Sequence, residues 1–337
     1  MDKPHTSYIS FVVVSRNDDH GGDMLRRMRF FIISLIRQCN VYRLPCELIV
    51  VEWNPPAERP LLHEVLPAPV VEDHLQIRYM VVPAEVHGSF ENPAGLPLHQ
   101  MIAKNAGIRR AGGEFIACTN IDVLFTDELF SRLAERKLSG KFFYRANRCD
   151  VIVPDDVNDP ELLLREAGKN IIRRWGMDHR YPGLKVFSQD FFMYRSSFFR
   201  PLYPLLQLAK RCLLGKWSYR IARLDKEASG DFTMMSKAAW TRINGYPEFP
   251  LYPAHIDSMA LIAADAEGLE QYIFPPEACI YHLEHEGGWR PGKHRGASLE
   301  WREVNRMGKE LLKNKTPFPY STDNWGLPGH DLGEISF

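Results

Sequence analysis

Apolar strand-like runs alternate with helix-like runs over the first 130 residues, and this alternation limits the possible folds more than any other feature. Residues 8–15, 46–54, 75–83 and 115–119 are rich in β-branched and aromatic side chains, as buried strands are. Residues 23–39 and 96–113 carry apolar side chains near helical spacing, the second as an amphipathic pattern closed by a glycine pair. Such alternation predicts an α/β fold with a mostly parallel sheet and helices on both faces.

The rest of the chain has regular signals in a different order. We predict a strand in 142–154 and a helix over 159–176 with Asp159 as its N-cap. Further along we expect a strand, a short helix and a turn in 230–249, a helix over 255–268, strand material in 271–289 and a helix over 297–314. The tail is expected to be loop-like, either as a lid over a bound ligand or as a surface wrap around Trp325.

Overall charge and cysteine usage exclude several classes of protein. Lys+Arg and Asp+Glu both total 42, so nothing indicates a nucleic-acid partner. The six cysteines are scattered without a C-x-x-C motif, which favours a reducing, cytoplasmic setting over a disulfide framework or a structural zinc site. The polar N-terminus does not resemble a signal peptide, and no run approaches the ~20 apolar residues that span a bilayer.

Polar side chains follow three of the predicted strands. The three ends are Ser15–Arg16–Asn17, Glu52–Trp53–Asn54 and Asn120–Ile121–Asp122. Because ligands bind beyond the carboxyl ends of parallel strands, we expect these ends to line a pocket. The Asp122 carboxylate suits Mg²⁺ or Mn²⁺, and the Asn120 amide can hydrogen-bond a ribose or base edge. The alternative is that Asn120 and Asp122 only cap the turn into the next helix.

Five segments, in order, resemble GT-A-fold glycosyltransferases of the family 2-like kind. "FVVVSRND" and "LIVVEWNPP" resemble their first two strands, and residues 99–130 resemble the stretch through the D-x-D or N-x-D metal motif. Residues 230–268 are similar to the acceptor segment, and "IYHLEHE" resembles the terminal strand that carries a metal-binding His. The likeness covers about 8–130 and 230–290. Asn120, Ile256 and Asn244 depart from the usual Asp, Glu and Gly of these motifs.

The resemblance implies roles for single residues. Asp122 would bind Mn²⁺ or Mg²⁺ with His282, and His285 is the second choice for that histidine. Asp257 would be the general base, with Asp231 in reserve or binding an acceptor hydroxyl. The nucleotide pocket would be lined by Ser15, Arg16, Asn17, Glu52, Lys104 and Asn120. Lys104 has a second interpretation, as a solvated helix lysine.

The resemblance also implies a reaction. The chain would move a sugar from a nucleoside diphosphate donor, UDP by default, to a glycan or lipid-linked hydroxyl, with inversion, in bacterial surface polysaccharide synthesis. The donor-binding half would be 1–140, an acceptor-side strand and basic helical insertion 141–229, the acceptor half 230–296, and a C-terminal helix and tail 297–337. A retaining transferase, a nucleotidyltransferase and a non-catalytic sugar-nucleotide or glycan binder remain as alternatives.

A basic segment interrupts the pattern at 194–224. It holds seven Lys and Arg residues and neither Asp nor Glu, with leucines and aromatic residues between the charges. This composition fits a helix pair that contacts the inner face of the cell membrane, or one that binds an anionic acceptor. The alternative is that its apolar residues pack on the core while the cations face solvent.

Overall fold

The computed structural model describes residues 7–70, 73–92, 95–154, 156–186, 202–285 and 297–337. A sheet of eight strands forms the centre, in the order β10-β6-β9-β4-β1-β2-β3-β12. Its strands are β1 (Ile9–Ser15), β2 (Cys46–Trp53), β3 (Leu75–Val82), β4 (Phe115–Thr119), β6 (Phe142–Arg145), β9 (Phe232–Ser236), β10 (Glu270–Ile273) and β12 (Gly333–Ser336). Only β9 and β12 run against the others, so the predicted mostly parallel α/β fold is confirmed.

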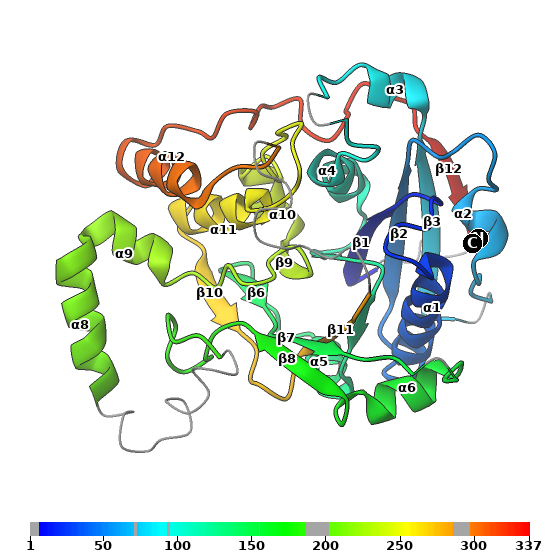
Figure 1. Ribbon diagram of the computed structural model, residues 1–337, viewed down its shortest axis with the longest axis horizontal. Helices are drawn as coiled ribbons and strands as arrows, with labels where there is room; N and C mark the ends of the chain where they lie inside the picture. Colours follow the sequence, from blue (N-terminus) through cyan, green and yellow to red (C-terminus); the bar gives the residue numbers. More distant parts are fainter. Residues whose placement is uncertain (1–6, 71–72, 93–94, 155, 187–201, 286–296) are drawn as a thin grey trace.

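Helices cover both faces of this sheet (Figure 1). On one face α1 (Met24–Val41) and α5 (Asp127–Ala134) pack against residues such as Phe11 and Val13. On the other face α4 (Gln100–Arg110), α10 (Lys237–Arg242), α11 (Ile256–Ala266) and α12 (Trp301–Asn314) build a second core. Alternate side chains of β1 and β2 point into the two cores, which explains why these strands are buried throughout and mostly apolar.

α4 lies close against the sheet, and its sequence explains how. A Cβ atom at Gly107 would lie 2.6 Å from Cγ1 of Val12, so only glycine permits this approach. Every residue from Met101 to Ile108 is buried. The predicted amphipathic helix over 96–113 is therefore corrected in two respects: it is shorter, and it is covered on all sides. The interpretation of Lys104 as a solvated lysine is wrong, because its side chain is fully buried.

A second, smaller sheet has the order β5-β11-β7-β8. Its strands are β5 (Val123–Phe125), β11 (Ile280–Leu283), β7 (Arg148–Val151) and β8 (Ile171–Trp175). The single strand predicted in 142–154 is in fact two strands, β6 and β7, which belong to different sheets. The helix predicted over 159–176 ends early, since α6 (Pro160–Ala167) is followed by β8. Asp159 does cap α6, accepting a hydrogen bond from the backbone N–H of Glu161.

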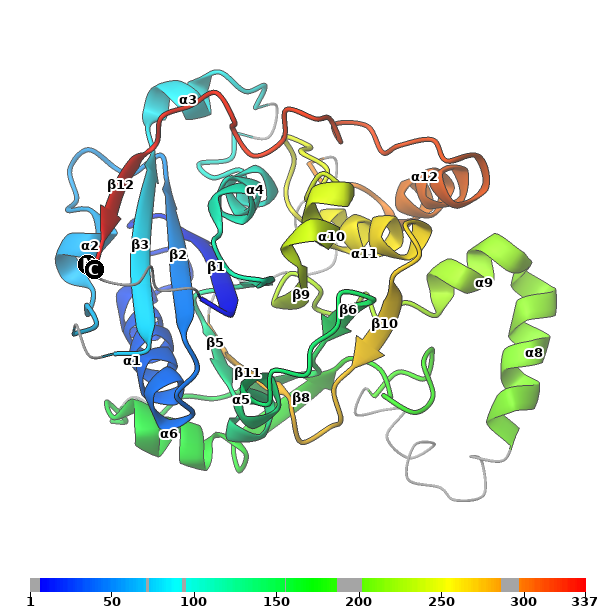
Figure 2. The same cartoon turned by 180° about the vertical axis from the view of Figure 1, so that it is seen from behind.

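The remaining helices are short or lie at the edge of the molecule. They are α2 (Leu62–Val65), α3 (Ala84–Gly88), α8 (Tyr203–Leu214) and α9 (Lys216–Ala222). Figures 1 and 2 both place α8 beyond α9, projecting away from the central sheet. Arg195 and Arg200 of the basic segment lie outside the described residues. None of the helices in the described ranges is long and apolar enough to cross a membrane.

The tail wraps around the outside of α4 and then joins the sheet. Arg109 stacks over the Trp325 ring, 5.2 Å from its centroid, and donates to the Trp325 carbonyl at 2.9 Å. Arg110 donates to the carbonyls of Gly326 and Leu327 at 2.8 and 2.7 Å. The last residues are not loop-like as predicted, because β12 pairs antiparallel with β3 and extends the sheet.

Candidate functional site

Asp122 lies on the turn between β4 and β5, at the carboxyl end of the central sheet. Its Oδ2 atom is 3.0 Å from Nε2 of His285 and 3.6 Å from Nε2 of His282. Asp122 is buried, and its Oδ1 atom has no hydrogen-bond partner among the described residues. Both histidines therefore face the same carboxylate, although the sequence favoured His282 over His285.

Strand pairing explains how residues 160 positions apart in the sequence come together. β11 runs antiparallel to β5, with His282 opposite Val123, the residue after Asp122. On its other edge β11 runs parallel to β7, with His282 opposite Asp150. His285 lies two residues beyond the end of β11, where side chains no longer have to alternate between the two faces of the sheet. It therefore reaches Asp122 as well.

Charge stabilises Asp122 in its ionised form. Burial alone would raise the pKa of Asp122, but His282, His285 and Arg27 outweigh it and hold that pKa well below its usual range. Arg27 lies on α1 and donates to the carbonyls of His20 and Gly21 at 3.0 and 3.2 Å. It connects the loop after β1 to the surroundings of Asp122, and the sequence analysis missed it.

The three side chains fit a divalent cation. One ligand atom each from Asp122, His282 and His285 lies within 4.8 Å of the others. The unpartnered Oδ1 of Asp122 is what a cation would satisfy, and a carboxylate with two imidazoles is a common donor set. Asp150, His282 and Glu284 form a second such group, but Asp150 already accepts from Arg148 and Trp175 at 2.6 and 2.8 Å. The first group is the better candidate.

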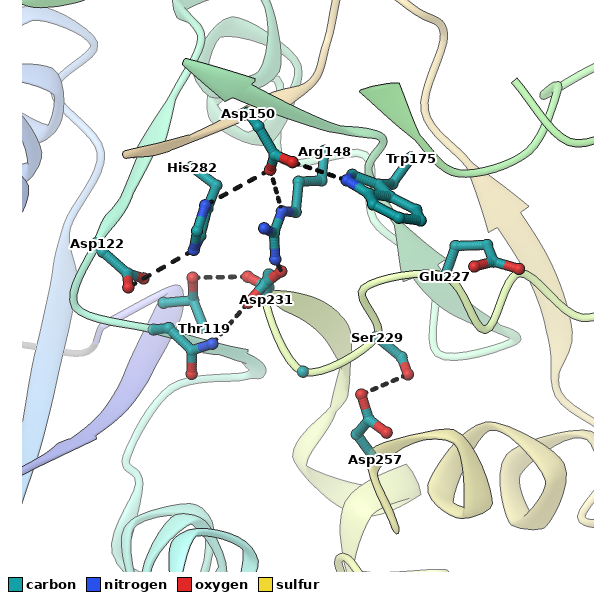
Figure 3. A network of polar contacts seen from close by, with 12 residues as sticks. Thr119, Asp122, Arg148, Asp150, Trp175, Glu227, Ser229, Asp231, Asp257 and His282 are labelled. Carbon is teal, nitrogen blue, oxygen red and sulfur yellow. Dashed lines mark hydrogen bonds and ion pairs between the residues drawn. The ribbon is translucent and has the colours of Figure 1, made fainter. Parts of the chain in front are cut away.

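A network of polar contacts extends from this cluster (Figure 3). Nδ1 of His282 is 3.5 Å from Oδ1 of Asp150, and Arg148 pairs with both Asp150 and Asp231. Burial would raise the pKa of Asp150, but its contacts with His282, Arg148 and Trp175 hold it well below the usual range. The figure shows one continuous line of contacts from Asp122 to Asp231.

Asn120 lies on the opposite side of Asp231 from Arg148. Its Nδ2 donates to Oδ1 of Asp231 at 2.6 Å, while its Oδ1 accepts from Lys104 at 3.0 Å and from Gln100 at 3.1 Å. The amide is thus engaged at both ends. Its contact with a ribose or base remains a prediction.

Lys104 lies beneath the carboxylates of the site. Its ammonium donates to the Gly230 carbonyl at 2.7 Å as well as to Asn120. Burial lowers the pKa of Lys104, and the negative charges of Asp231, Asp257 and Asp122 act on it in the opposite direction. One buried cation therefore lies close enough to interact with all three of the aspartates that the sequence singled out as site residues.

Asp257 lies in the first turn of α11 and is half-buried. Ser229 donates to its Oδ2 at 2.7 Å, and the backbone N–H of Ser258 donates to its Oδ1 at 2.8 Å. Figure 3 shows Asp257 and Ser229 in contact with each other, apart from the Asp122–His282 pair. Asp257 nevertheless lies near the residue before Asp231, because a Cβ atom at Gly230 would lie 3.3 Å from Oδ2 of Asp257.

Four of the six predicted nucleotide-binding residues, Ser15, Arg16, Asn17 and Glu52, form a second group at the ends of β1 and β2, whereas Lys104 and Asn120 lie beside Asp231. Ser15 and Glu52 are partners in the register of the two strands. Nε of Arg16 donates to the Asn54 carbonyl at 2.6 Å, and Asn17 donates to the Pro60 carbonyl at 2.8 Å. The structure therefore joins the loops after β1 and β2. Arg27, which contacts the loop after β1 and acts on the charge of Asp122, lies between this group and the Asp122 cluster, so the three strand ends form two neighbouring groups.

Glu52 has an unusual environment within this second group. Its Oε2 accepts from the backbone N–H of Leu62 at 2.8 Å, and its Oε1 is buried without a partner among the described residues. Burial raises the pKa of Glu52 to about 7. A carboxyl that changes charge near neutrality can accept a hydrogen bond from an N–H group of a ligand.

Arg148 and Asp150 were also missed by the sequence analysis. Both lie on β7, where they flank the buried Cys149 and point to the side of the sheet that carries His282. The alternation of charged residues around one buried residue in "RCDV" is a strand signal, but it does not reveal the partner strand.

No protein-family model and no curated protein sequence matches the chain. Among solved structures it is similar to S. aureus TarS 1–349 in complex with UDP-GlcNAc, at 13% identity and a TM-score of 0.44 over 90% of this chain and 66% of the other. It is also similar to a second structure of S. aureus TarS 1–349, at 12% identity and a TM-score of 0.41 over 91% of this chain and 72% of the other. A third similar structure is S. aureus TarS, at 13% identity and a TM-score of 0.39 over 82% of this chain and 36% of the other.

Proposed function

We propose that the protein is a glycosyltransferase of the GT-A type, which moves a sugar from a nucleoside diphosphate donor to a hydroxyl of a glycan or lipid-linked glycan. UDP is the default nucleotide, and bacterial surface polysaccharide synthesis is the proposed setting. The observation that carries the proposal is the contact of Asp122 with His285 and His282 at the carboxyl end of β4. Motifs about 160 residues apart, each resembling a part of one metal site, meet there.

The loops after β1 and β2 hold the nucleotide in this proposal. Glu52 accepts a hydrogen bond from the base, and Arg16 offers positive charge at the rim of the same group. Arg27 and Lys104 add two buried cations on the path from this group to Asp257. Such fixed charges favour a diphosphate, which is negative in the donor and more so as it leaves.

Asp122, His282 and His285 would hold a divalent cation, with Mn²⁺ favoured over Mg²⁺ because two of the three ligands are imidazoles. When bound, the cation supplies positive charge that offsets the diphosphate. The residues around the three ligands would orient them: Asp150 lies beside Nδ1 of His282, and a carboxylate in that position holds the imidazole with its other nitrogen toward a metal ion.

Asp257 is the proposed general base. It takes the proton of the acceptor hydroxyl while that oxygen attacks the anomeric carbon, and the bond from that carbon to the diphosphate breaks with inversion. Ser229 and the N–H of Ser258 fix the carboxylate. Asp231 is less suited to this role, since it is more buried than Asp257 and is held in an ion pair by Arg148 as well as by the Asn120 amide. It is better placed to support the site or to bind an acceptor hydroxyl.

The test is a donor panel with and without Mn²⁺. We expect thermal stabilisation by UDP that requires Mn²⁺, and hydrolysis or transfer from one UDP-sugar. The anomeric configuration of the product, read by NMR, then separates inversion from retention. Stabilisation without turnover of any donor would support a non-catalytic binder. A failure of every nucleoside diphosphate to stabilise the protein, with Mn²⁺ present, would overturn the proposal.

A further inference from the structure

α8 exposes an apolar stripe along its length. Leu205, Leu208 and Leu213 are 63%, 58% and 85% exposed, and Ala209 and Cys212 lie between them on the same side of the helix. Spacings of three, four and seven residues place all five on one face. The sequence left open whether these leucines pack on the core. In the structure these three leucines are exposed and do not pack on the core.

The opposite side of α8 is the one attached to the protein. The Tyr203 ring packs on Tyr181 with centroids 4.8 Å apart, and its hydroxyl donates to the Pro182 carbonyl. Gln207, one turn later, lies against Gly183. The orientation of the helix is therefore fixed by its inner side, and the exposure of the leucines places the stripe on its outer side. The helix itself lies at the edge of the molecule (Figures 1 and 2).

Positive charge borders the stripe. Lys210 and Arg211 lie on α8 and Lys216 begins α9, and among the described residues none of the three has an acidic group within ion-pair distance. Arg220 is different, because it pairs with Asp265 at 2.6 Å. The sequence from 194 to 224 contains no acidic residue at all. Exposed leucines flanked only by cations are complementary to a surface that is apolar beneath and negative on top.

We propose that the outer face of α8 docks on an anionic lipid membrane, with the leucines inserted below the headgroups and the three cations at the phosphate level. A second copy of the chain is a poorer occupant. The stripe is only roughly 12 Å long, so it offers far less area than a stable protein–protein interface buries. Pairing two copies through this face would also bring their cations together. The docking does not depend on the proposed reaction.

The test uses the full-length protein and sedimentation with lipid vesicles at low salt. One set of vesicles is phosphatidylcholine alone, and the other contains a third phosphatidylglycerol. We expect binding to the second set and little to the first. The triple variant Leu205→Ser, Leu208→Ser, Leu213→Ser should lose binding by about tenfold or more. Arg211→Gln with Lys216→Gln should lose about fivefold per charge.

The matched control changes exposed apolar residues elsewhere. Val41→Ser with Ile152→Ser removes side chains that are 59% and 53% exposed, and it should leave vesicle binding unchanged. All three variants alter exposed positions, so circular dichroism should show native folding. Absence of vesicle binding at low salt overturns the proposal. So does equal loss in the control, or a change of oligomeric state in the leucine variant, which would assign the stripe to a second copy.

Discussion

Arg148 holds Asp231 in place from the neighbouring sheet, with its Nη1 atom 2.5 Å from Oδ2 of that carboxylate. The same guanidinium donates through Nε to Asp150 at 2.6 Å. β7, which carries Arg148, belongs to the small sheet, whereas Asp231 directly precedes β9 of the central sheet. The pair therefore connects His282, through Asp150, to Asp231, on the side of the site that we propose for the acceptor.

Replacing Arg148 should destabilise the protein strongly. Arg148→Met leaves two buried carboxylates, Asp150 and Asp231, without their common cation, and breaking such a pair costs about 3–5 kcal/mol. Urea unfolding measures the change. Arg148→Met with Asp231→Asn should recover part of the loss, because one of the two charges is gone.

Arg165→Met, at an exposed ion pair, is the control and should change the free energy of unfolding by less than about 0.5 kcal/mol. A loss below 1 kcal/mol in Arg148→Met would contradict the role given to this residue.

Metal affinity should depend on Asp122 and both histidines but not on position 120. Asp122→Asn or His285→Ala should weaken Mn²⁺ binding by about 100-fold in calorimetry, since each removes one of three ligands. Asn120→Asp should change the affinity by less than about threefold, because the new carboxylate faces Asp231 and Lys104 rather than the cluster. Asp127→Asn is the surface control. Tighter Mn²⁺ binding by Asn120→Asp would show that position 120 belongs to the metal site after all.

Asp257→Asn should separate chemistry from binding. We expect kcat to fall by about 10²–10⁴ while UDP affinity stays within about twofold, because a base acts only on the acceptor proton. Single-turnover transfer and UDP calorimetry measure the two quantities. The comparison variant is Asp231→Asn, which should also lower stability since it removes a partner of Arg148. Near-normal turnover in Asp257→Asn would move the base to another residue.

Much of the fold could be predicted because the central strands are buried on both faces. β1, β2 and β4 are buried from end to end and mostly apolar, and no other structure suits such short apolar runs between helices. β8 was missed because "IIRRW" continues the helical spacing of α6, and only its pairing with β7 makes it a strand. β12 was missed because "GEIS" has no apolar pattern and is held by its backbone pairing with β3.

The site was predictable only in part, for a similar reason. The sequence indicated Asp122 and the two histidines by their resemblance to known motifs, but it could not show that both histidines reach one carboxylate. That depends on where β11 ends. Arg148 and Asp150 carried no motif, and they enter the site only because the register places Asp150 opposite His282. Contacts that a long-range strand register creates cannot be read from local patterns.

Nucleoside binding should become tighter as pH rises through 7. Burial raises the pKa of Glu52 to about 7, and an N–H group of a base donates a stronger hydrogen bond to the ionised carboxylate than to the protonated carboxyl. Uridine, which lacks phosphates, should therefore bind about tenfold more tightly at pH 8 than at pH 6. Glu52→Gln should remove this dependence. A uridine affinity in the native protein that does not change with pH would exclude a charged Glu52 from base recognition.

The same raised pKa has an opposite effect on the free protein. The folded state holds the Glu52 proton more tightly than the unfolded chain does, because the pKa of Glu52 in the unfolded chain is near 4.5. The contribution of Glu52 to stability is thus fully present below pH 4.5 and is lost as pH rises through 7. Unfolding of native protein and Glu52→Gln, compared between pH 5 and pH 8, measures it. The free energy of unfolding of the native protein, relative to that of Glu52→Gln, should fall from pH 5 to pH 8.

The tail should act as a strap and not as a lid, and Trp325 is the residue that separates the two. Trp325 is buried, stacks under Arg109, and the next residue, Gly326, donates to Glu248 at 2.8 Å. Trp325→Ala should lower the free energy of unfolding by about 3–5 kcal/mol, as loss of a buried aromatic side chain does. Tyr320→Ala, at a half-exposed position in the same tail, is the control and should lower the free energy of unfolding by less.

A lid closes on the donor, so its loss would raise the donor KM at temperatures where the variant is folded. A strap leaves KM unchanged, and this is the outcome that the attachment of the tail to α4 and β3 predicts.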